Sequence, residues 1–243
     1  MRGRFAFAAV ATVMLACAAS LPAAAQTAVD LQLVLAVDAS GSVDQVRFDL
    51  QKRGYVAAFR HARVLQAIRS GPHQAIAVTM VQWTGPMMQV QVAEWSAVGD
   101  EQTAAAFAAT IERVPRQLFG GGTSISGAID HALTLFPRSP FRASRRVIDV
   151  SGDGSNNRGR PVTLARDEAV AAGIGINGLP ILALEPDLDR YYQDNVIGGP
   201  GAFVVAAKDF ETFGEAILKK LIAEIAGVDP KVSGARAYAG APD

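Results

Sequence analysis

The sequence predicts an α/β fold: a doubly wound, mostly parallel, six-stranded sheet with one antiparallel edge strand and helices on both faces. Apolar runs of strand length alternate along the chain with segments of helical length. The run at residues 31–37 carries no charge and predicts a strand buried on both faces. Residues 87–98 instead alternate apolar and polar side chains, which is typical of an edge strand with one face in water.

The first 25 residues have the pattern of a signal peptide. Arg2 and Arg4 precede an apolar stretch at 5–19, and an Ala-x-Ala site ends at Ala25. The apolar stretch is short for a membrane span and has no second basic flank, so we expect cleavage after Ala25 and no transmembrane anchor afterwards. This pattern predicts a protein of the bacterial periplasm or exterior.

Composition narrows the classes of partner. Cys17 is the only cysteine and lies in the leader, so disulfides and zinc–thiolate sites are excluded from the mature chain. Lipid attachment at Cys17 is disfavoured because Met14 and Leu15 suit such a site poorly. Without the two leader arginines, 21 basic residues face 23 acidic ones, and no basic stripe suggests nucleic acid.

Residues 26–227 have a length compatible with one α/β domain, and residues 228–243, rich in Gly, Ala and Pro, predict a flexible C-terminal tail. After the first strand, residues 44–60 predict a helix that is apolar on two sides, which is typical of a helix packed between neighbours. Residues 75–83 form a second apolar strand, and a Thr-Gly-Pro turn joins it to the edge strand, which therefore runs antiparallel. An Ala-rich helix follows at 104–113.

The second half of the chain continues the alternation. Three glycines at 120–122 open a helix, and the last helix has a single apolar stripe that includes Phe213, Ile217 and Leu221. The segment at 185–195, with Tyr191 and Tyr192, is expected to be a loop. The remaining elements are expected, in order, as a helix at 125–136, a strand at 145–150, a helix at 163–173, strands at 175–184 and 202–206, and a helix at 210–226.

Oxygen-bearing side chains follow the buried strands. Asp38, Ser40 and Ser42 alternate with small residues directly after the first strand, Thr123 follows the glycine run, and Asp153 follows the strand at 145–150. Right-handed crossovers bring these positions to the same edge of the sheet. Carboxylate and hydroxyl oxygens suit a hard divalent cation.

Each motif also has a purely structural interpretation. The stretch after the first strand could be a turn in which Ser42 or Asp44 caps the next helix. The glycine run could be a flexible loop with Thr123 or Ser124 as the cap. No lysine follows the glycines in the spacing of a nucleotide-binding P-loop, so that interpretation is rejected.

Taken together and in this order, the motifs resemble the metal-ion-dependent adhesion site of von Willebrand factor type A (vWA) domains. The resemblance covers about residues 30–226 and implies a Rossmann-like vWA fold, similar to a branch of exported bacterial single-domain proteins without a defined role. It implies that Ser40, Ser42 and Thr123 offer hydroxyl oxygens to Mg²⁺ or Mn²⁺, with Asp38 and Asp153 bound directly or through water.

The resemblance implies a function: a partner carboxylate, from Asp or Glu, completes the coordination of the cation. One residue departs from the family pattern. Gly152 stands where a threonine is common, which removes a hydroxyl behind the metal ligands and lowers the metal affinity expected. The leading hypothesis is therefore an exported, non-enzymatic, metal-dependent protein-binding module, and Tyr191 and Tyr192 are possible partner contacts.

Two other functions remain open. An interaction scaffold with a degenerate metal site would bind its partner without any cation. A hydrolase using the same loops would need a histidine near Ser124, for which His131 is the nearest candidate in sequence. Aspartyl phosphate transfer through Asp38 would call for a second acid where Ser40 stands.

Overall fold

A computed structural model of the protein describes residues 26–228, so the expected leader and all of the expected tail beyond Val228 lie outside the described residues. The central sheet has five strands in the order β4-β3-β2-β6-β7, and only the β3–β4 pair is antiparallel. This architecture confirms the predicted fold class. The strands are β2 (Leu31–Asp38), β3 (Ile76–Trp83), β4 (Gln89–Val98), β6 (Arg145–Gly152) and β7 (Gly175–Pro180). A separate short parallel pair joins β1 (Thr27–Ala28) to β5 (Phe141–Arg142).

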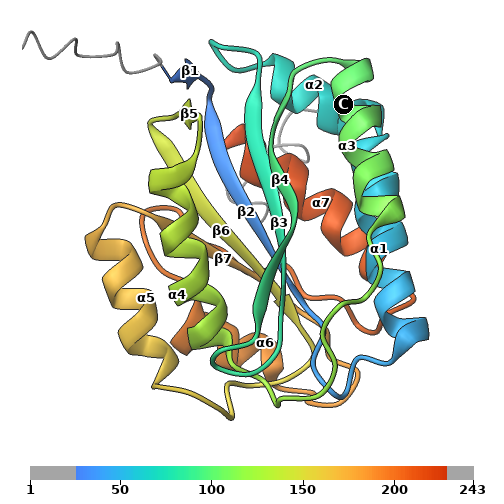
Figure 1. The fold of residues 1–243 in the computed structure, drawn as a ribbon, viewed down its shortest axis with the longest axis vertical. Helices are drawn as coiled ribbons and strands as arrows, with labels where there is room; N and C mark the ends of the chain where they lie inside the picture. Colours follow the sequence, from blue (N-terminus) through green and yellow to red (C-terminus); the bar gives the residue numbers. More distant parts are fainter. Residues whose placement is uncertain (1–25, 229–243) are drawn as a thin grey trace, which may run out of the picture.

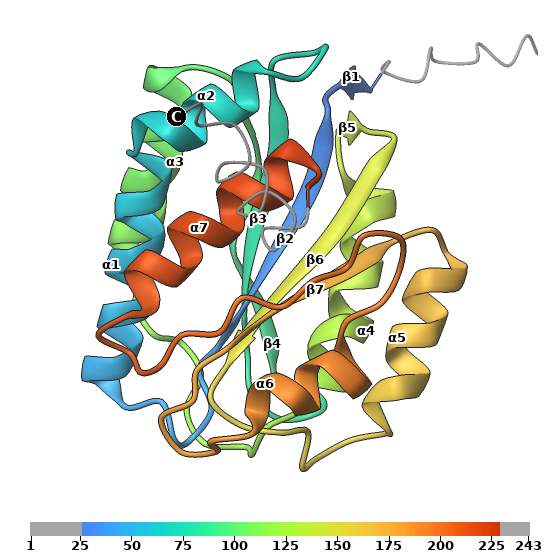
Figure 2. The same ribbon diagram turned by 180° about the vertical axis from the view of Figure 1, so that it is seen from behind.

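Helices cover both faces of the sheet (Figures 1 and 2). One face carries α1 (Gln45–Phe59), α2 (Ala62–Arg69), α3 (Glu101–Arg113) and α7 (Phe213–Ala226). The other carries α4 (Ile125–Leu135) and α5 (Val162–Ala171), together with α6 (Leu188–Tyr191) and two irregular turns, η1 (Phe136–Arg138) and η2 (Tyr192–Val196). Among residues 26–228, none of these helices is long and apolar enough to cross a membrane.

The pleat of β2 divides the core into two clusters. Leu33 and Leu35 pack with residues of α1 and α7, whereas Val34 and Ala36 pack with residues of α4 and α5. Every residue of β2 is buried, as expected for a central strand with helices on both sides. The strand therefore delivers Asp38 to the edge of the sheet from a rigid position.

Helix α1 lies between α3 and α7, and its two apolar sides are buried to different extents. The rings of Tyr55 and Phe213 meet edge to face with centroids 5.4 Å apart, and those of Phe59 and Phe107 with centroids 4.9 Å apart. Val46, on the other side, is exposed. The helix is therefore packed between neighbours as predicted, although Val46 at its start faces solvent.

The chain between residues 185 and 207 departs most from the expected pattern. The expected loop contains α6 and a π-helical turn, η2, instead. β7 ends at Pro180, and the expected last strand makes only isolated bridges beside it, between Gly178 and Val204 and between Ile181 and Ala207. The sheet therefore has five strands and not the six predicted, and this segment lies beside β7 without forming a strand.

Strand β4 forms one edge of the sheet and is irregular. Its pairing with β3 shifts register on both sides of Met80, which lies opposite Ala93. The hydroxyl of Thr79 donates to the Ala93 carbonyl at 2.7 Å and accepts from the Gln91 amide at 2.8 Å, so side chains fill the irregular stretch. A bulge of this kind bends and twists an edge strand.

An ionic cluster is buried between the sheet and α7. The ammonium of Lys220 lies 2.7 Å from Asp149 of β6 and 3.4 Å from Glu224, and all three side chains are buried. Asn177 of β7 donates to Glu224 at 2.7 Å. The cluster ties α7 to β6 and β7 at their centre.

Candidate metal centre

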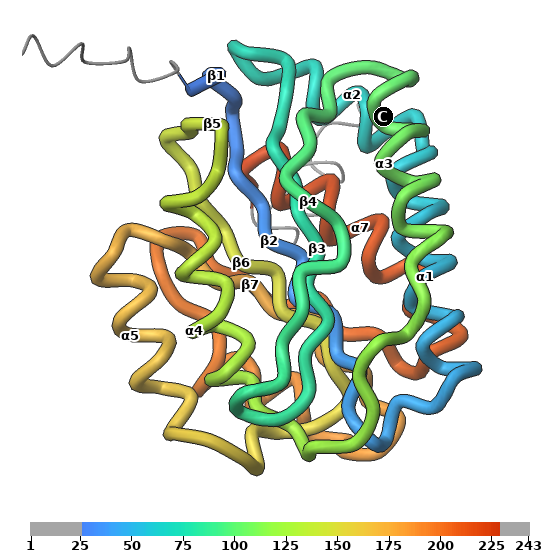
Figure 3. The backbone as a smooth tube through the Cα atoms, in the orientation of Figure 1, coloured from blue at the N-terminus to red at the C-terminus, as the bar shows by residue number. Residues whose placement is uncertain are grey.

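The five predicted ligands come from three loops at the carboxyl edge of the sheet, at the bottom of Figures 1 and 3. β2 ends at Asp38, β6 ends immediately before Asp153, and Thr123 stands two residues before α4 begins. Because parallel strands end at the same edge, positions 115 residues apart in the chain meet there.

Hydrogen bonds connect four of the five residues: the Asp38 carboxylate accepts from two backbone amides, and the side chains of Ser40, Ser42 and Asp153 bond to one another. The Asp38 carboxylate accepts from the Ser40 amide at 2.7 Å, and the hydroxyl oxygens of Ser40 and Ser42 are 3.2 Å apart. The Ser42 hydroxyl donates to Asp153 at 2.6 Å, and the Asp153 amide lies 3.4 Å from the other oxygen of Asp38. Asp44, outside this set, caps α1 by accepting from the Arg47 amide at 2.8 Å. The two serines thus serve the cluster and leave the capping to Asp44.

The glycine loop places Thr123 beside the same cluster. Its three glycines have φ angles in the left-handed region that favours glycine, with values of 72° at Gly120, 84° at Gly121 and 77° at Gly122. The amides of Asn157 and Arg158 donate to the Thr123 carbonyl at 2.9 and 3.1 Å. The Thr123 hydroxyl oxygen lies 3.5 Å from the point where a Cβ on Gly154 would stand, so it adjoins the Asp153 loop. The structure therefore brings all five predicted residues together.

The cluster holds negative charge that the protein compensates only in part. Burial, reinforced by the nearby Asp153 carboxylate, raises the pKa of Asp38 to about 7. Burial also raises the pKa of Asp153, against the opposing effects of Ser42 and Arg47. One Asp153 oxygen has no hydrogen-bond partner among residues 26–228, and the Arg47 guanidinium stands 3.9 Å from it. A bound cation would stabilise the ionised forms of both carboxylates and would give the unpaired Asp153 oxygen a partner.

The donor set fits a hard divalent cation. Two carboxylates and three hydroxyls supply only oxygen, which Mg²⁺ and Mn²⁺ prefer, and they leave room for water or for an outside ligand. No group of three His, Cys, Asp or Glu side chains suited to a metal occurs in the described part of the chain. The side chains whose oxygens suit such a cation are those of Asp38, Ser40, Ser42, Thr123 and Asp153.

Some residues around the cluster escaped sequence analysis. Arg47 donates to the Ser42 carbonyl at 2.7 Å, and Arg116 donates to the carbonyls of Ala39 and Ser40 at 3.0 and 2.9 Å. Glu185 accepts from the Ser155 amide at 3.0 Å, next to the Asp153 loop. The three residues form no common sequence motif, because Arg47 lies in α1, Arg116 after α3 and Glu185 after β7. The Asn156-Asn157 pair, in contrast, directly follows the Asp153 motif in the sequence. The side-chain oxygens of these asparagines accept from the backbone amides of Ser126 and Thr123, and their position could have indicated this role.

The structure explains why position 152 carries a glycine. A Cβ there would stand 2.9 Å from an Asp38 carboxylate oxygen, 3.1 Å from the Tyr192 hydroxyl and 3.2 Å from Trp83. Tyr192 is fully buried in this space, which corrects the expectation that it contacts a partner. Tyr191 is half-buried, and its hydroxyl accepts from the Asn156 amide at 3.2 Å, so for this residue a partner contact stays a prediction.

Substituting Gly152 by alanine is expected to destabilise the fold by about 1–3 kcal/mol, since the new methyl group meets Asp38 and Tyr192 below contact distance. Gly154→Ala is the matched control, because its Cβ would meet its nearest neighbour at an ordinary 3.4 Å. Urea unfolding of both variants measures the difference. Equal stabilities would mean that the space behind Asp38 is not filled.

Ser124, the candidate nucleophile of the hydrolase alternative, acts as a helix cap. Its hydroxyl accepts from the Gly127 amide at 3.1 Å, and the residue is fully buried. His131 lies seven positions further along α4, which is about 10 Å along the helix axis. The structure therefore does not pair these two residues.

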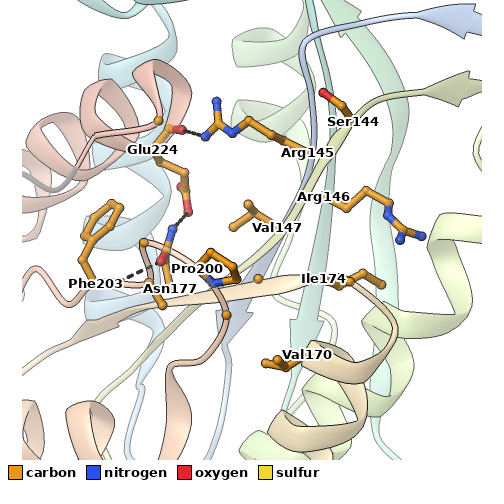
Figure 4. A pocket seen from close by; sticks show the side chains of 16 residues that line it. Ser144, Arg145, Arg146, Val147, Val170, Ile174, Asn177, Pro200, Phe203 and Glu224 are labelled. Atoms are coloured by element: carbon orange, nitrogen blue, oxygen red, sulfur yellow. Dashed lines mark hydrogen bonds between the residues drawn. The ribbon is translucent and has the colours of Figure 1, made fainter.

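A separate cavity of about 310 Å³ opens near the amino ends of β6 and β7, away from the oxygen cluster (Figure 4). Arg145 donates to the carbonyls of Glu224 and Ile225 at the end of α7, and Arg146 donates to the Ala172 carbonyl at the end of α5. A cationic side chain at a helix C-terminus interacts favourably with the negative end of the helix dipole. The arginines of this cavity therefore have a structural role.

Comparisons place this geometry among known folds. No curated protein matches the sequence. The structure resembles a von Willebrand factor type A protein from Catenulispora acidiphila (18% identity, TM-score 0.55), covering 82% of this chain and 43% of the other. It also resembles proximal thread matrix protein 1 from the mussel byssus, solved with a zinc-occupied MIDAS motif, where MIDAS stands for metal-ion-dependent adhesion site. The sequence identity is 16% and the TM-score 0.57, and the match covers 83% of this chain and 47% of the other.

A third similar structure is the pilus adhesin SpaC from Lactobacillus rhamnosus GG (14% identity, TM-score 0.58, 82% of this chain and 31% of the other). The chain spans less than half the length of each of these three proteins. Such likenesses show the fold, which is that of a vWA domain. The family described as "Protein of unknown function (DUF1194)" matches residues 28–229, and the chain belongs to this family.

Proposed function

We propose that the chain is a non-enzymatic protein-binding module that holds Mg²⁺ or Mn²⁺ at Asp38, Ser40, Ser42, Thr123 and Asp153. An Asp or Glu carboxylate of a protein partner binds through this cation. The observation that carries the proposal is the set of hydrogen bonds that gathers Asp38, Ser40, Ser42 and Asp153 at one edge of the sheet, with the Thr123 hydroxyl beside the Asp153 loop. The two carboxylates of the set balance the charge of the cation without exceeding it, and the three hydroxyls are neutral, so an outside carboxylate can take a coordination position that the protein leaves open.

The likeness to adhesive and matrix proteins supports the same proposal. One similar structure is described as a pilus adhesin, and another as having a zinc-occupied MIDAS motif. The N-terminal pattern of a signal peptide adds a location, in which the module meets its partner in the periplasm or outside the cell.

Titration calorimetry with MgCl₂ and MnCl₂ tests the metal site. Wild type is expected to take up one ion, and Asp38→Ala is expected to bind it more than about tenfold more weakly, because even indirect losses at metal sites reach that size. Asp187→Ala, which removes an exposed carboxylate at the same edge outside the cluster, serves as the control and is expected to bind like wild type. Equal heats from wild type and Asp38→Ala would contradict the proposal.

Partner capture with and without EDTA separates the proposal from its alternatives. A carboxylate bridged by the cation is released by the chelator. A partner that stays bound in EDTA would instead support an interaction scaffold with a degenerate metal site.

A further inference from the structure

Exposed apolar side chains concentrate around the oxygen cluster. Seven large apolar residues among residues 26–228 are exposed, and five of them lie in the loops, or at the helix start, of the carboxyl edge. We call these five the apolar rim; their exposed fractions are Val46 67%, Met87 92%, Met88 37%, Phe119 61% and Leu184 53%. Single exposed apolar side chains are ordinary, but a gathering of them on one surface marks an interaction site.

Direct contacts hold the rim against the cluster. A Cβ on Gly121 would stand 2.8 Å from the Met88 sulfur, so the turn between β3 and β4 packs on the glycine loop that carries Thr123. The Ser124 amide also donates to the Thr84 carbonyl of that turn at 2.7 Å. The turn that carries both methionines is therefore held against the glycine loop that leads to Thr123.

Phe119, which directly precedes the glycine loop, is held by Arg116. The Arg116 guanidinium lies over its ring at 4.7 Å from the centroid and donates to the carbonyls of Ala39 and Ser40. The Arg116 side chain thus links Phe119 to the backbone of residues 38–42, which we call the ligand loop. Leu184 precedes Glu185, whose carboxylate lies 3.4 Å from the Cβ position of Gly154.

Charge and apolar character on this surface complement one kind of partner. Arg47 and Arg116 stand beside the cluster, and a bound divalent cation offsets its two carboxylates, so the two guanidinium groups outweigh the nearby Glu185 carboxylate. Methionine side chains adapt to apolar groups of different shape, and Met, Phe and Arg are enriched in the centres of protein interfaces. The surface therefore combines a positive centre with an apolar border on the side of Met87, Met88 and Phe119.

We propose that the partner presents an acidic residue with apolar side chains directly beside it, which the apolar rim receives while the carboxylate reaches the cation. This inference rests on the proposed function and adds the chemistry of the partner segment. An Asp or Glu flanked only by polar residues would bind the cation but leave the rim in water, and it would bind more weakly.

A peptide library of defined design tests the inference. Short bead-bound peptides carry a fixed central Glu with free flanking positions, and a matched library carries Gln instead. With Mg²⁺ present, wild type is expected to select Leu, Ile, Met or Phe next to Glu and to select nothing from the Gln library. Selection of polar flanks, or no selection by a protein that calorimetry shows to bind Mg²⁺, would overturn the inference.

Variants separate the rim from the metal. Met87→Ser with Phe119→Ser is expected to weaken binding of the selected peptides about tenfold or more, with the Mg²⁺ affinity unchanged. Leu164→Ser, which removes an exposed apolar side chain from α5 on another part of the surface, is the control and is expected to bind like wild type. If the double variant binds these peptides as tightly as wild type, the rim does not receive the partner. Failure of the metal itself to bind shows in calorimetry and counts against the proposed function instead.

Discussion

Lys220→Met is expected to lower the free energy of unfolding by about 3–5 kcal/mol. The ammonium of Lys220 is fully buried at 2.7 Å from Asp149 and 3.4 Å from Glu224. Its removal leaves two buried acids without their cation, and the penalty for an uncompensated buried charge exceeds the small gain from an apolar side chain. Urea unfolding at neutral pH measures the change.

Lys219→Met is the matched control, since this neighbour on α7 is exposed and its loss is expected to cost less than about 0.5 kcal/mol. A second variant adds Asp149→Leu to Lys220→Met, and it is expected to recover part of the stability because one of the two unpaired acids is gone. Similar stabilities of the Lys220 and Lys219 variants would show that the buried cluster does not hold α7 to the sheet.

The metal-free protein is expected to lose stability as pH rises from about 4 to about 7, owing to Asp38. Burial and the Asp153 carboxylate raise the pKa of Asp38 from 3.8 in the unfolded chain to about 7 in the fold. Between these values the folded state holds a proton that the unfolded state has released, so unfolding becomes easier with rising pH. The shift corresponds to about 4 kcal/mol, fully reached above pH 7.

Asp38→Asn isolates this group, because asparagine does not titrate in this range. In EDTA, the stability of the variant relative to wild type is expected to increase by about 4 kcal/mol between pH 4 and pH 8. Denaturant unfolding at a series of pH values gives this difference. Added Mg²⁺ is expected to stabilise wild type at pH 8 and to leave Asp38→Asn unchanged. A difference that stays constant with pH would contradict the assigned environment of Asp38.

The sequence predicts the sheet, and the gathering of the five oxygen-bearing residues at one edge of it, because both depend on local patterns. The apolar run that ends at Asp38 and the glycines before Thr123 each fix a local conformation, and the order of strands then brings their ends together. Helix α2 was missed, since it is short and its cap is His61, a residue that gives little warning of a helix start.

Other features depend on contacts between distant segments. Arg116 reaches the ligand loop from 76 positions away, and Tyr192 fills the space beside Gly152 from a turn expected to be a plain loop. The pairing of Lys220 with Asp149 could not be predicted from the sequence either, because a lysine on an amphipathic helix is ordinarily solvated. Such residues become recognisable only when the fold brings their partners close.

The irregular pairing around Met80 has a consequence for how copies of the protein meet. A straight, regular outer strand offers its free amides and carbonyls to the same strand of another molecule, and fibres grow in this way. The bulged β4 presents a bent border that cannot match a second copy along its length. Crowding many copies together would therefore not join their sheets into a continuous ribbon along this flank.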